Sequence, residues 1–403
     1  MRKHFNIYLL RLKIILLMLL SIFLICTCAK EDSWMSLNYK VTKLCQQGRY
    51  PEATEVAEEA LQLAAKTFRS DHPNVAASLN NLAQLYRVQG RYAEAEPLYK
   101  QALEIKEKAH GPDHPDVTTS LNNLALLYHS QNKYGEAEAL SKRALEIWEK
   151  ARGPDHPDVA KWLNNMAALY RAQDRFSEAE ALYKRALEIW EKARGPDHLD
   201  VVKSLNNLAL LYHSQGKYAE AEALYKQALE IWEKALGPDH PDVAKSLNNL
   251  AALYRAQDRF SEAEALSKRA LEIWEKAFRP DHPNVAKSLN NLALLYHSQG
   301  KYAEAEPLYM RALEIKEKSL WPEHPDVAKS LNNLALFYHS QDKYAEAEPL
   351  YKRVLVIKEK ALGPDHPDVA TVLENMVKCC REMGKKDEAE SLEARAKNIR
   401  ANR

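Results

Sequence analysis

A tripeptide, Asp-His-Pro, recurs along this 403-residue chain at a fixed interval of 42 residues. The copies begin at Asp71, Asp113, Asp155, Asp239, Asp281 and Asp365, with the variants Asp-His-Leu at Asp197 and Glu-His-Pro at Glu323. A second marker, Leu-Asn-Asn, keeps the same register from Leu79 to Leu331. Because the period holds without an insertion, the chain is a tandem array of one supersecondary unit.

Each unit predicts a hairpin of two helices. In the unit 197–238, residues 201–212 contain neither glycine nor proline and place apolar side chains at helical spacing. Gly216 follows at the position where a left-handed residue ends a helix. A second segment with helical spacing then runs from about residue 218 to residue 232. One hairpin cannot bury its own apolar face, so neighbouring units must stack.

The junction between units carries stop and start signals. Gly237 and Pro238 end the second helix, Asp239 is expected to cap the next one, and Pro241 falls within its first turn. Four tryptophans share a side of the second helix with an alanine stripe, which favours packing between repeats over a cofactor site. They are Trp148, Trp190, Trp232 and Trp274.

The core of the unit resembles the tetratricopeptide repeat. The matching residues are Leu205, Leu208, Ala209, Tyr212, Gly216, Tyr218, Ala221, Tyr225 and Ala228, with Leu205 in place of the usual tryptophan. The 42-residue length and the run Leu-Asn-Asn-Leu-Ala-Leu-Leu-Tyr are similar to the kinesin light chain subclass. The resemblance covers residues 37–403, about nine repeats with divergent ends. It implies an all-α fold: an elongated, right-handed superhelical solenoid of antiparallel helix pairs.

Charge and motifs argue against several function classes. The chain has 57 basic and 56 acidic residues, so no global basic field favours nucleic acid. No nucleophile elbow, phosphate loop or acidic dyad occurs, and the prominent polar residues are repeated rather than singular, so we expect no enzyme and no cofactor. Cys45, Cys379 and Cys380 lack the spacing of a disulfide framework or zinc site, and no metal site is expected.

In tetratricopeptide repeats the side of the first helix that faces away from the core lines an inner groove. On a helical wheel this side carries a lysine in five repeats and a pair of asparagines in seven. The lysines are Lys161, Lys203, Lys245, Lys287 and Lys329. The asparagines are Asn80, Asn81, Asn122, Asn123, Asn164, Asn165, Asn206, Asn207, Asn248, Asn249, Asn290, Asn291, Asn332 and Asn333.

These two columns predict a peptide-binding groove. Asparagine amides donate and accept, which suits the backbone of an extended peptide, and the lysines favour an acidic ligand or a C-terminal carboxylate. Two alternatives stay open for the asparagines: one of each pair bonds a neighbouring helix or carbonyl, or recent duplication copied them regardless of use. Lysine is also an ordinary solvated residue. Arginine or histidine follows at the groove edge, as at Arg87, Arg171, Arg255, His129 and His213.

The first 28 residues predict an export leader. Basic residues precede an apolar run from Ile14 to Ile25, and no acidic residue occurs before Glu31. The sequence around Cys28 resembles a bacterial lipoprotein box, with Thr27 where a smaller residue is usual. We therefore expect Cys28 to be lipidated and the protein to be held at the bacterial cell envelope. The alternatives are ordinary cleavage after Ala29, giving a secreted or periplasmic protein, and a retained leader that anchors the chain.

The function expected from these observations is that of a non-enzymatic scaffold or adaptor. It would hold an extended peptide or partner protein in the concave groove, as the resemblance implies. The alternative is a structural component of an envelope assembly that uses the convex face or the ends of the solenoid.

Overall fold

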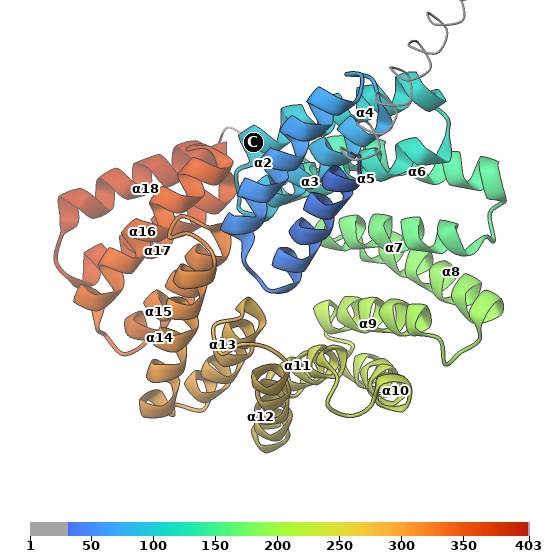
Figure 1. The fold of residues 1–403 in the computed structure, drawn as a ribbon. Coiled ribbons are helices and arrows are strands. Elements are labelled where there is room, and N and C mark those ends of the chain that lie inside the picture. Colours follow the sequence, from blue (N-terminus) through green and yellow to red (C-terminus); the bar gives the residue numbers. More distant parts are fainter. Residues whose placement is uncertain (1–30, 402–403) are drawn as a thin grey trace, which may run out of the picture.

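The computed structural model describes residues 31–401, which form nine antiparallel helix pairs in one curved, all-α solenoid (Figure 1). Neighbouring pairs stack along the chain, as the repeat pattern predicts. The pairs are residues 31–46 with α2 (Tyr50–Thr67); α3 (Pro73–Val88) with α4 (Tyr92–His110); η1 (Pro115–Val117) and α5 (Thr118–Ser130) with α6 (Tyr134–Arg152); α7 (Pro157–Ala172) with α8 (Phe176–Arg194); α9 (Leu199–Ser214) with α10 (Tyr218–Leu236); α11 (Pro241–Ala256) with α12 (Phe260–Ala277); α13 (Pro283–Ser298) with α14 (Tyr302–Ser319); α15 (Pro325–His339) with α16 (Tyr344–Leu362); and α17 (Pro367–Glu382) with α18 (Lys386–Ala401).

From the second repeat onward, the helical segment that opens each repeat is capped by histidine, not by the aspartate that the sequence suggested. His240 is the N-cap residue of α11, and its Nδ1 accepts the backbone N–H of Asp242 at 3.1 Å. Asp239 lies one residue too early for this role. An imidazole nitrogen at the N-cap therefore satisfies one of the N–H groups that a helix start leaves without a partner.

The hairpin turns and the core agree with the sequence. Gly216 has a φ of 72°, the left-handed conformation expected where the first helix ends. Trp190, Trp232 and Trp274 are buried in one apolar cluster that runs through α7 to α14. Their indoles therefore pack between repeats, as predicted.

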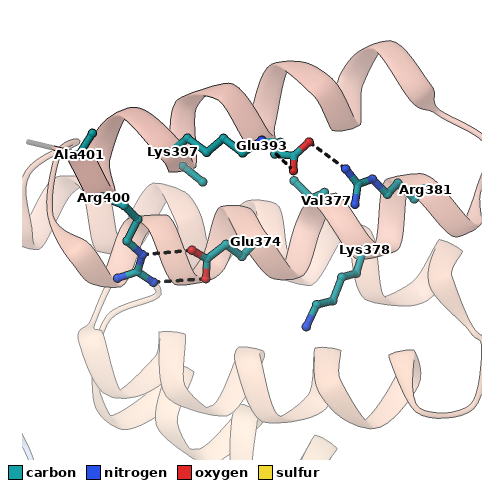
Figure 2. A pocket seen from close by; sticks show the side chains of 9 residues that line it. Glu374, Val377, Lys378, Arg381, Glu393, Lys397, Arg400 and Ala401 are labelled. Atoms are coloured by element: carbon teal, nitrogen blue, oxygen red, sulfur yellow. Dashed lines mark hydrogen bonds and ion pairs between the residues drawn. The ribbon is translucent and has the colours of Figure 1, made fainter.

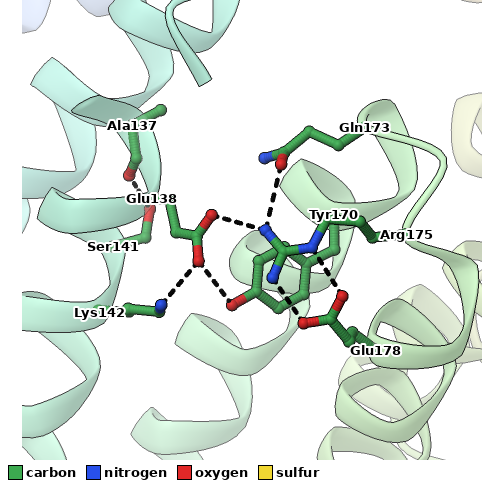
Figure 3. Close-up of polar contacts among 8 residues, drawn as sticks. All are labelled: Ala137, Glu138, Ser141, Lys142, Tyr170, Gln173, Arg175 and Glu178. Carbon is green, nitrogen blue, oxygen red and sulfur yellow. Dashed lines mark hydrogen bonds and ion pairs between the residues drawn. The ribbon is translucent and has the colours of Figure 1, made fainter. Parts of the chain in front are cut away.

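A polar network also joins consecutive repeats (Figure 3). The hydroxyl of Tyr170 donates to Glu138 Oε1 at 3.1 Å, and Arg175 Nη1 donates to Glu138 Oε2 at 2.7 Å. The Arg175 guanidinium lies 3.9 Å from the centroid of the Tyr170 ring, a cation–π contact. The tyrosine–glutamate bond recurs at Tyr86–Glu58, Tyr128–Glu96, Tyr212–Glu180, Tyr254–Glu222, Tyr296–Glu264 and Tyr338–Glu306.

The solenoid closes on itself rather than extending, which corrects the expectation of an elongated shape. The turn that follows residues 31–46 meets the start of α13, where His282 Nε2 lies 3.3 Å from the Gln46 carbonyl oxygen. One repeat further on, His324 bonds the Val88 carbonyl oxygen and α16 contacts α4. In Figure 1 the N-terminal helices accordingly lie beside the C-terminal ones. Small rotations between identical repeats add up to this full turn.

Among residues 31–401, no helix combines the length and the apolar character needed to cross a bilayer. The predicted leader, with Cys28, lies outside the described residues.

Candidate binding groove

The first helices of the repeats form the inner face of the curve. Consecutive first helices contact one another, as α7 does with α9 and α11 with α13. In Figure 1 these helices line the inside of the curve, while α8, α10 and α12 lie outside. We call the exposed and half-buried polar face of α3, α5, α7, α9, α11, α13 and α15 the groove surface.

The five predicted lysines are all exposed on this surface. Three of them are already paired within their own helix: Lys203 with Asp200 at 3.0 Å, Lys245 with Asp242 at 2.8 Å and Lys329 with Asp326 at 2.9 Å. Exposed pairs of this kind contribute little to stability, so their ammonium groups stay available to a ligand.

The paired asparagines form a ladder of hydrogen bonds between repeats. The first asparagine of a pair donates to a serine of the next repeat, as in Asn164 Nδ2 to Ser204 Oγ at 2.9 Å. The second donates to the first asparagine of the preceding repeat, as in Asn165 Nδ2 to Asn122 Oδ1 at 2.8 Å. The same bonds occur at Asn80–Ser120, Asn248–Ser288, Asn81–Asn38, Asn123–Asn80 and Asn333–Asn290, while Asn206 donates to Val202 O of its own helix.

The ladder is interrupted in the middle of the chain. The second asparagines Asn207, Asn249 and Asn291 are half-buried on the groove surface and make no side-chain hydrogen bond within residues 31–401. They lie on three consecutive first helices, α9, α11 and α13. Of the fourteen predicted asparagines, these three and Asn332 on α15 keep both donor and acceptor unused, so these four amides are the best placed to meet a ligand.

At the groove edge, arginine or histidine at the end of each first helix stands over a side chain from the second helix of the same repeat. Arg87 faces Tyr99 and Arg171 faces Tyr183. Burial raises the pKa of both tyrosines, and the guanidinium beside each hydroxyl opposes that rise by hydrogen bonding and charge. Burial lowers the pKa of His129, His213 and His297, and the charge of Arg255 lowers that of His213 further.

Possible metal ligands gather at two places in the described part of the chain. His110, His114 and Asp116 lie together on an exposed loop, but His114 Nδ1 already accepts the Asp116 N–H at 3.2 Å. Glu348 lies near Cys380 and Glu388, but its carboxylate is held by two lysines, Lys352 and Lys385, each at 2.6 Å. Both groups therefore already have structural partners, and no metal chemistry is assigned to them.

Fold and groove together define a class of protein, the solenoids of tandem helix hairpins. More specifically, the chain belongs to the tetratricopeptide repeat family. The model of that family matches residues 35–108, 80–150, 133–192, 158–234, 200–276, 248–318 and 326–402. No curated protein matches the chain.

Solved structures with a similar fold come from several proteins. A putative kinesin light chain of Podosopora anserina is 30% identical over 51% of this chain and 97% of that chain, with a TM-score of 0.43. A Rap protein complexed with competence and sporulation factor is 16% identical over 93% of this chain and 98% of that chain, with a TM-score of 0.57. The quorum sensor NprR from B. thuringiensis in its apo form is 18% identical over 92% of this chain and 97% of that chain, with a TM-score of 0.53. The likeness to the Rap protein and to NprR is one of fold alone.

The sequence alone did not show which asparagines form hydrogen bonds between repeats. All seven pairs follow a leucine in the same register, and the position of serine and asparagine side chains in the adjacent repeat decides which amide is bonded. Two signals were available: Trp162 and Val372 stand at the position where Ser120, Ser204 and Ser288 accept from the preceding repeat, which leaves Asn122 and Asn332 without that partner.

Proposed function

We propose that this protein is a non-enzymatic scaffold or adaptor that binds an extended peptide segment of a partner protein along the groove surface. The observation that carries the proposal is the row of unpartnered amides at Asn207, Asn249 and Asn291. Amides spaced by one repeat can each donate to and accept from the backbone of an extended peptide.

The charges of the groove support an acidic ligand. Lys161 and Lys287 are exposed and have no hydrogen-bond or ion-pair partner within residues 31–401. The three lysines that pair with aspartate lie in the same column. A cationic column on a concave face raises the local concentration of acidic segments and speeds their association.

The test uses a fluorescent library of random 12-residue peptides and the protein carrying Asn207→Ala and Asn249→Ala. We expect loss of at least tenfold in affinity for the selected peptides, because two hydrogen-bonding groups are removed, with no loss of thermal stability. The control is Lys150→Glu with Lys192→Glu, two exposed lysines near the ends of the outer helices α6 and α8. Equal binding by the asparagine variant and the wild type would contradict the groove as the binding surface.

The protein is exported and held at the bacterial cell envelope through a lipid on Cys28. The basic and apolar leader and the lipoprotein-like sequence at Cys28 support this part of the proposal. Metabolic labelling with a palmitate analogue tests it: the label should be absent from the Cys28→Ser variant and the variant should leave the membrane fraction. Persistent labelling of Cys28→Ser would overturn the assignment.

A further inference from the structure

In the second helix of each repeat, one side chain lies beneath the arginine or histidine near the end of the first helix. The two residues are twelve positions apart in the sequence. In five repeats this side chain is a tyrosine that is almost completely buried. The tyrosines are Tyr99, Tyr183, Tyr225, Tyr309 and Tyr351. The rings pack in apolar clusters with residues of two consecutive first helices, as Tyr225 does with Ala209 of α9 and Leu250 of α11.

The last repeat shows that the same place accepts a carboxylate. There, Glu393 occupies the tyrosine register, and Arg381 occupies the position of the groove-edge arginines. Arg381 Nη2 donates to Glu393 Oε2 at 2.8 Å (Figure 2). The chain thus contains its own example of an arginine at this position that binds a carboxylate.

One repeat has the arginine but neither the tyrosine nor the glutamate. Arg255 ends the polar face of α11, and the register beneath it is Ser267 on α12. The missing ring leaves a cavity of about 30 Å³ between α11 and α13, lined by Asn248, Arg255, Ser267 and Asn291 together with alanine and leucine side chains. A space of this size holds one or two water molecules, which is comparable to a carboxylate group.

Two of the polar groups around this cavity, Arg255 and Asn291, are donors without a partner among the described residues. The guanidinium of Arg255 makes no hydrogen bond or ion pair within residues 31–401, and the amide of Asn291 makes none either. Asn248 is engaged, through its bond to Ser288 Oγ at 3.4 Å. The charge of Arg255 is felt by His213, whose pKa it lowers in addition to the larger effect of burial. The cavity is therefore cationic.

We propose that an acidic side chain of a peptide bound in the groove enters this cavity and pairs with Arg255, while Asn291 donates a second hydrogen bond to the carboxylate. This inference rests on the proposed function. It adds that the bound peptide must carry aspartate or glutamate at one position. A guanidinium donates two parallel N–H groups to a carboxylate. A neutral amide has the same shape as the carboxylate but lacks its negative charge.

The chain supplies a matched control for this cavity. Ser141 also replaces the tyrosine, but His129 stands at the position of the arginine in that repeat. Ser141 Oγ donates to the Ala137 carbonyl oxygen of its own helix at 2.8 Å. Ser267→Tyr and Ser141→Tyr both restore the residue found in five other repeats, so we expect both variants to fold. Only the first would fill the cavity beside Arg255.

The experiment compares two fluorescent libraries of 12-residue peptides that are random except for a central residue, which is glutamate in one library and glutamine in the other. We expect the wild type to bind the glutamate library about tenfold more tightly, the advantage of a charge-assisted hydrogen bond. Ser267→Tyr and Arg255→Gln should abolish this preference, and Ser141→Tyr should retain it. Circular dichroism confirms that each variant is folded.

The outcomes separate this inference from the proposed function. If the wild type binds both libraries equally, or if Ser267→Tyr keeps the preference for glutamate, the carboxylate site is overturned while groove binding stands. If the wild type binds neither library, the proposed function is overturned and the carboxylate site with it.

Discussion

The imidazole of His282 donates from Nε2 to the carbonyl oxygen of Gln46 across 3.3 Å, although 236 residues separate them. The direction of the bond follows from the other ring nitrogen: His282 Nδ1 accepts the Asn284 N–H at 3.1 Å, so in the neutral ring the proton lies on Nε2. One histidine thus caps α13 and also fastens it to the first repeat.

Two residues that depart from the repeat pattern lie at this closure. Two positions before the Asp-His-Pro segment, five repeats carry glycine and one carries Arg69, while the two repeats that meet the first superhelical turn carry Arg279 and Trp321. The Arg91 guanidinium lies 5.6 Å from the centroid of the Trp321 ring, within cation–π range. The closure therefore combines the repeated histidines His282 and His324 with a side chain, Trp321, that departs from the repeat.

Gly90→Ala should open the closure. A Cβ at Gly90 would clash with Cγ and Cδ of Pro325, so the two turns would have to separate. Gly300→Ala is the control, because Gly300 has nearly the same φ, 71° against 74°, but open space around it. Both variants should lose about 1–2 kcal/mol from the left-handed backbone. Only Gly90→Ala should increase the radius of gyration measured by small-angle X-ray scattering; an equal increase in both would contradict the contact.

The closure should also weaken in mild acid. Burial is the main cause that lowers the pKa of His282 and of His324 below the ordinary value. A histidine whose pKa is lowered on folding contributes stability that is complete above about pH 6.5, its unfolded value, and is lost as the pH falls through the lowered folded value. We expect the radius of gyration to rise between pH 7.5 and pH 5.

The charged neighbours of these histidines do not reverse this expectation. Arg279 lowers the pKa of His282 and Asp281 raises it; around His324, Asp326 raises the pKa while Lys316 and Lys329 lower it. In both cases burial remains the largest cause.

Replacement of both histidines by asparagine tests the mechanism. Asparagine keeps an oxygen that can cap the helix but does not titrate, so the His282→Asn/His324→Asn variant should be open and insensitive to pH. His240→Asn, at a half-exposed cap without a contact across the turn, should keep the pH response of the wild type.

The tyrosine–glutamate bonds between repeats should weaken at a lower pH than the closure does. Burial by itself would raise the pKa of Glu222, but hydrogen bonds from Lys226, Arg259 and Tyr254 outweigh it and lower the pKa to about 2. A carboxylate of this kind contributes stability that is complete above its unfolded value, about pH 4.5, and is lost as the pH falls toward 2.

The Glu222→Gln variant should therefore melt at a lower temperature than the wild type at pH 7, with a smaller difference at pH 2.5. Thermal denaturation followed by circular dichroism at both values measures this. A difference that does not depend on pH would show that the ionised carboxylate is not what stabilises this junction.

Two adjacent asparagines should differ sharply in their effect on stability. Asn248 is buried and bonded to Ser288, so Asn248→Ala leaves a buried hydroxyl without its partner and should cost about 1–3 kcal/mol. Asn249 has no such bond, and Asn249→Ala should leave the melting temperature unchanged or slightly raise it, because alanine is the better helix former. Equal destabilisation by both would contradict the division of the ladder into structural and free amides.

The sequence by itself determined what depends on the pattern of apolar and turn residues within one repeat. Helix limits, the left-handed Gly216 and the buried tryptophans follow from periodicity and turn residues, since these are local properties and each repeat packs only on the next. The cap was missed by one residue, His240 instead of Asp239, because both can accept a hydrogen bond and only backbone geometry chooses between them.

Tertiary structure decided what depends on the distances between side chains of neighbouring repeats, or on the rotations between repeats added over the whole array. Identical asparagine pairs acquire different roles because a bond to Ser204 or Asn122 requires that side chain to lie within about 3 Å. The cavity beside Arg255 exists only because Ser267 lies beneath it in space. The closure joins His282 to Gln46 because small rotations between repeats add up over the whole array, and no local pattern records that sum.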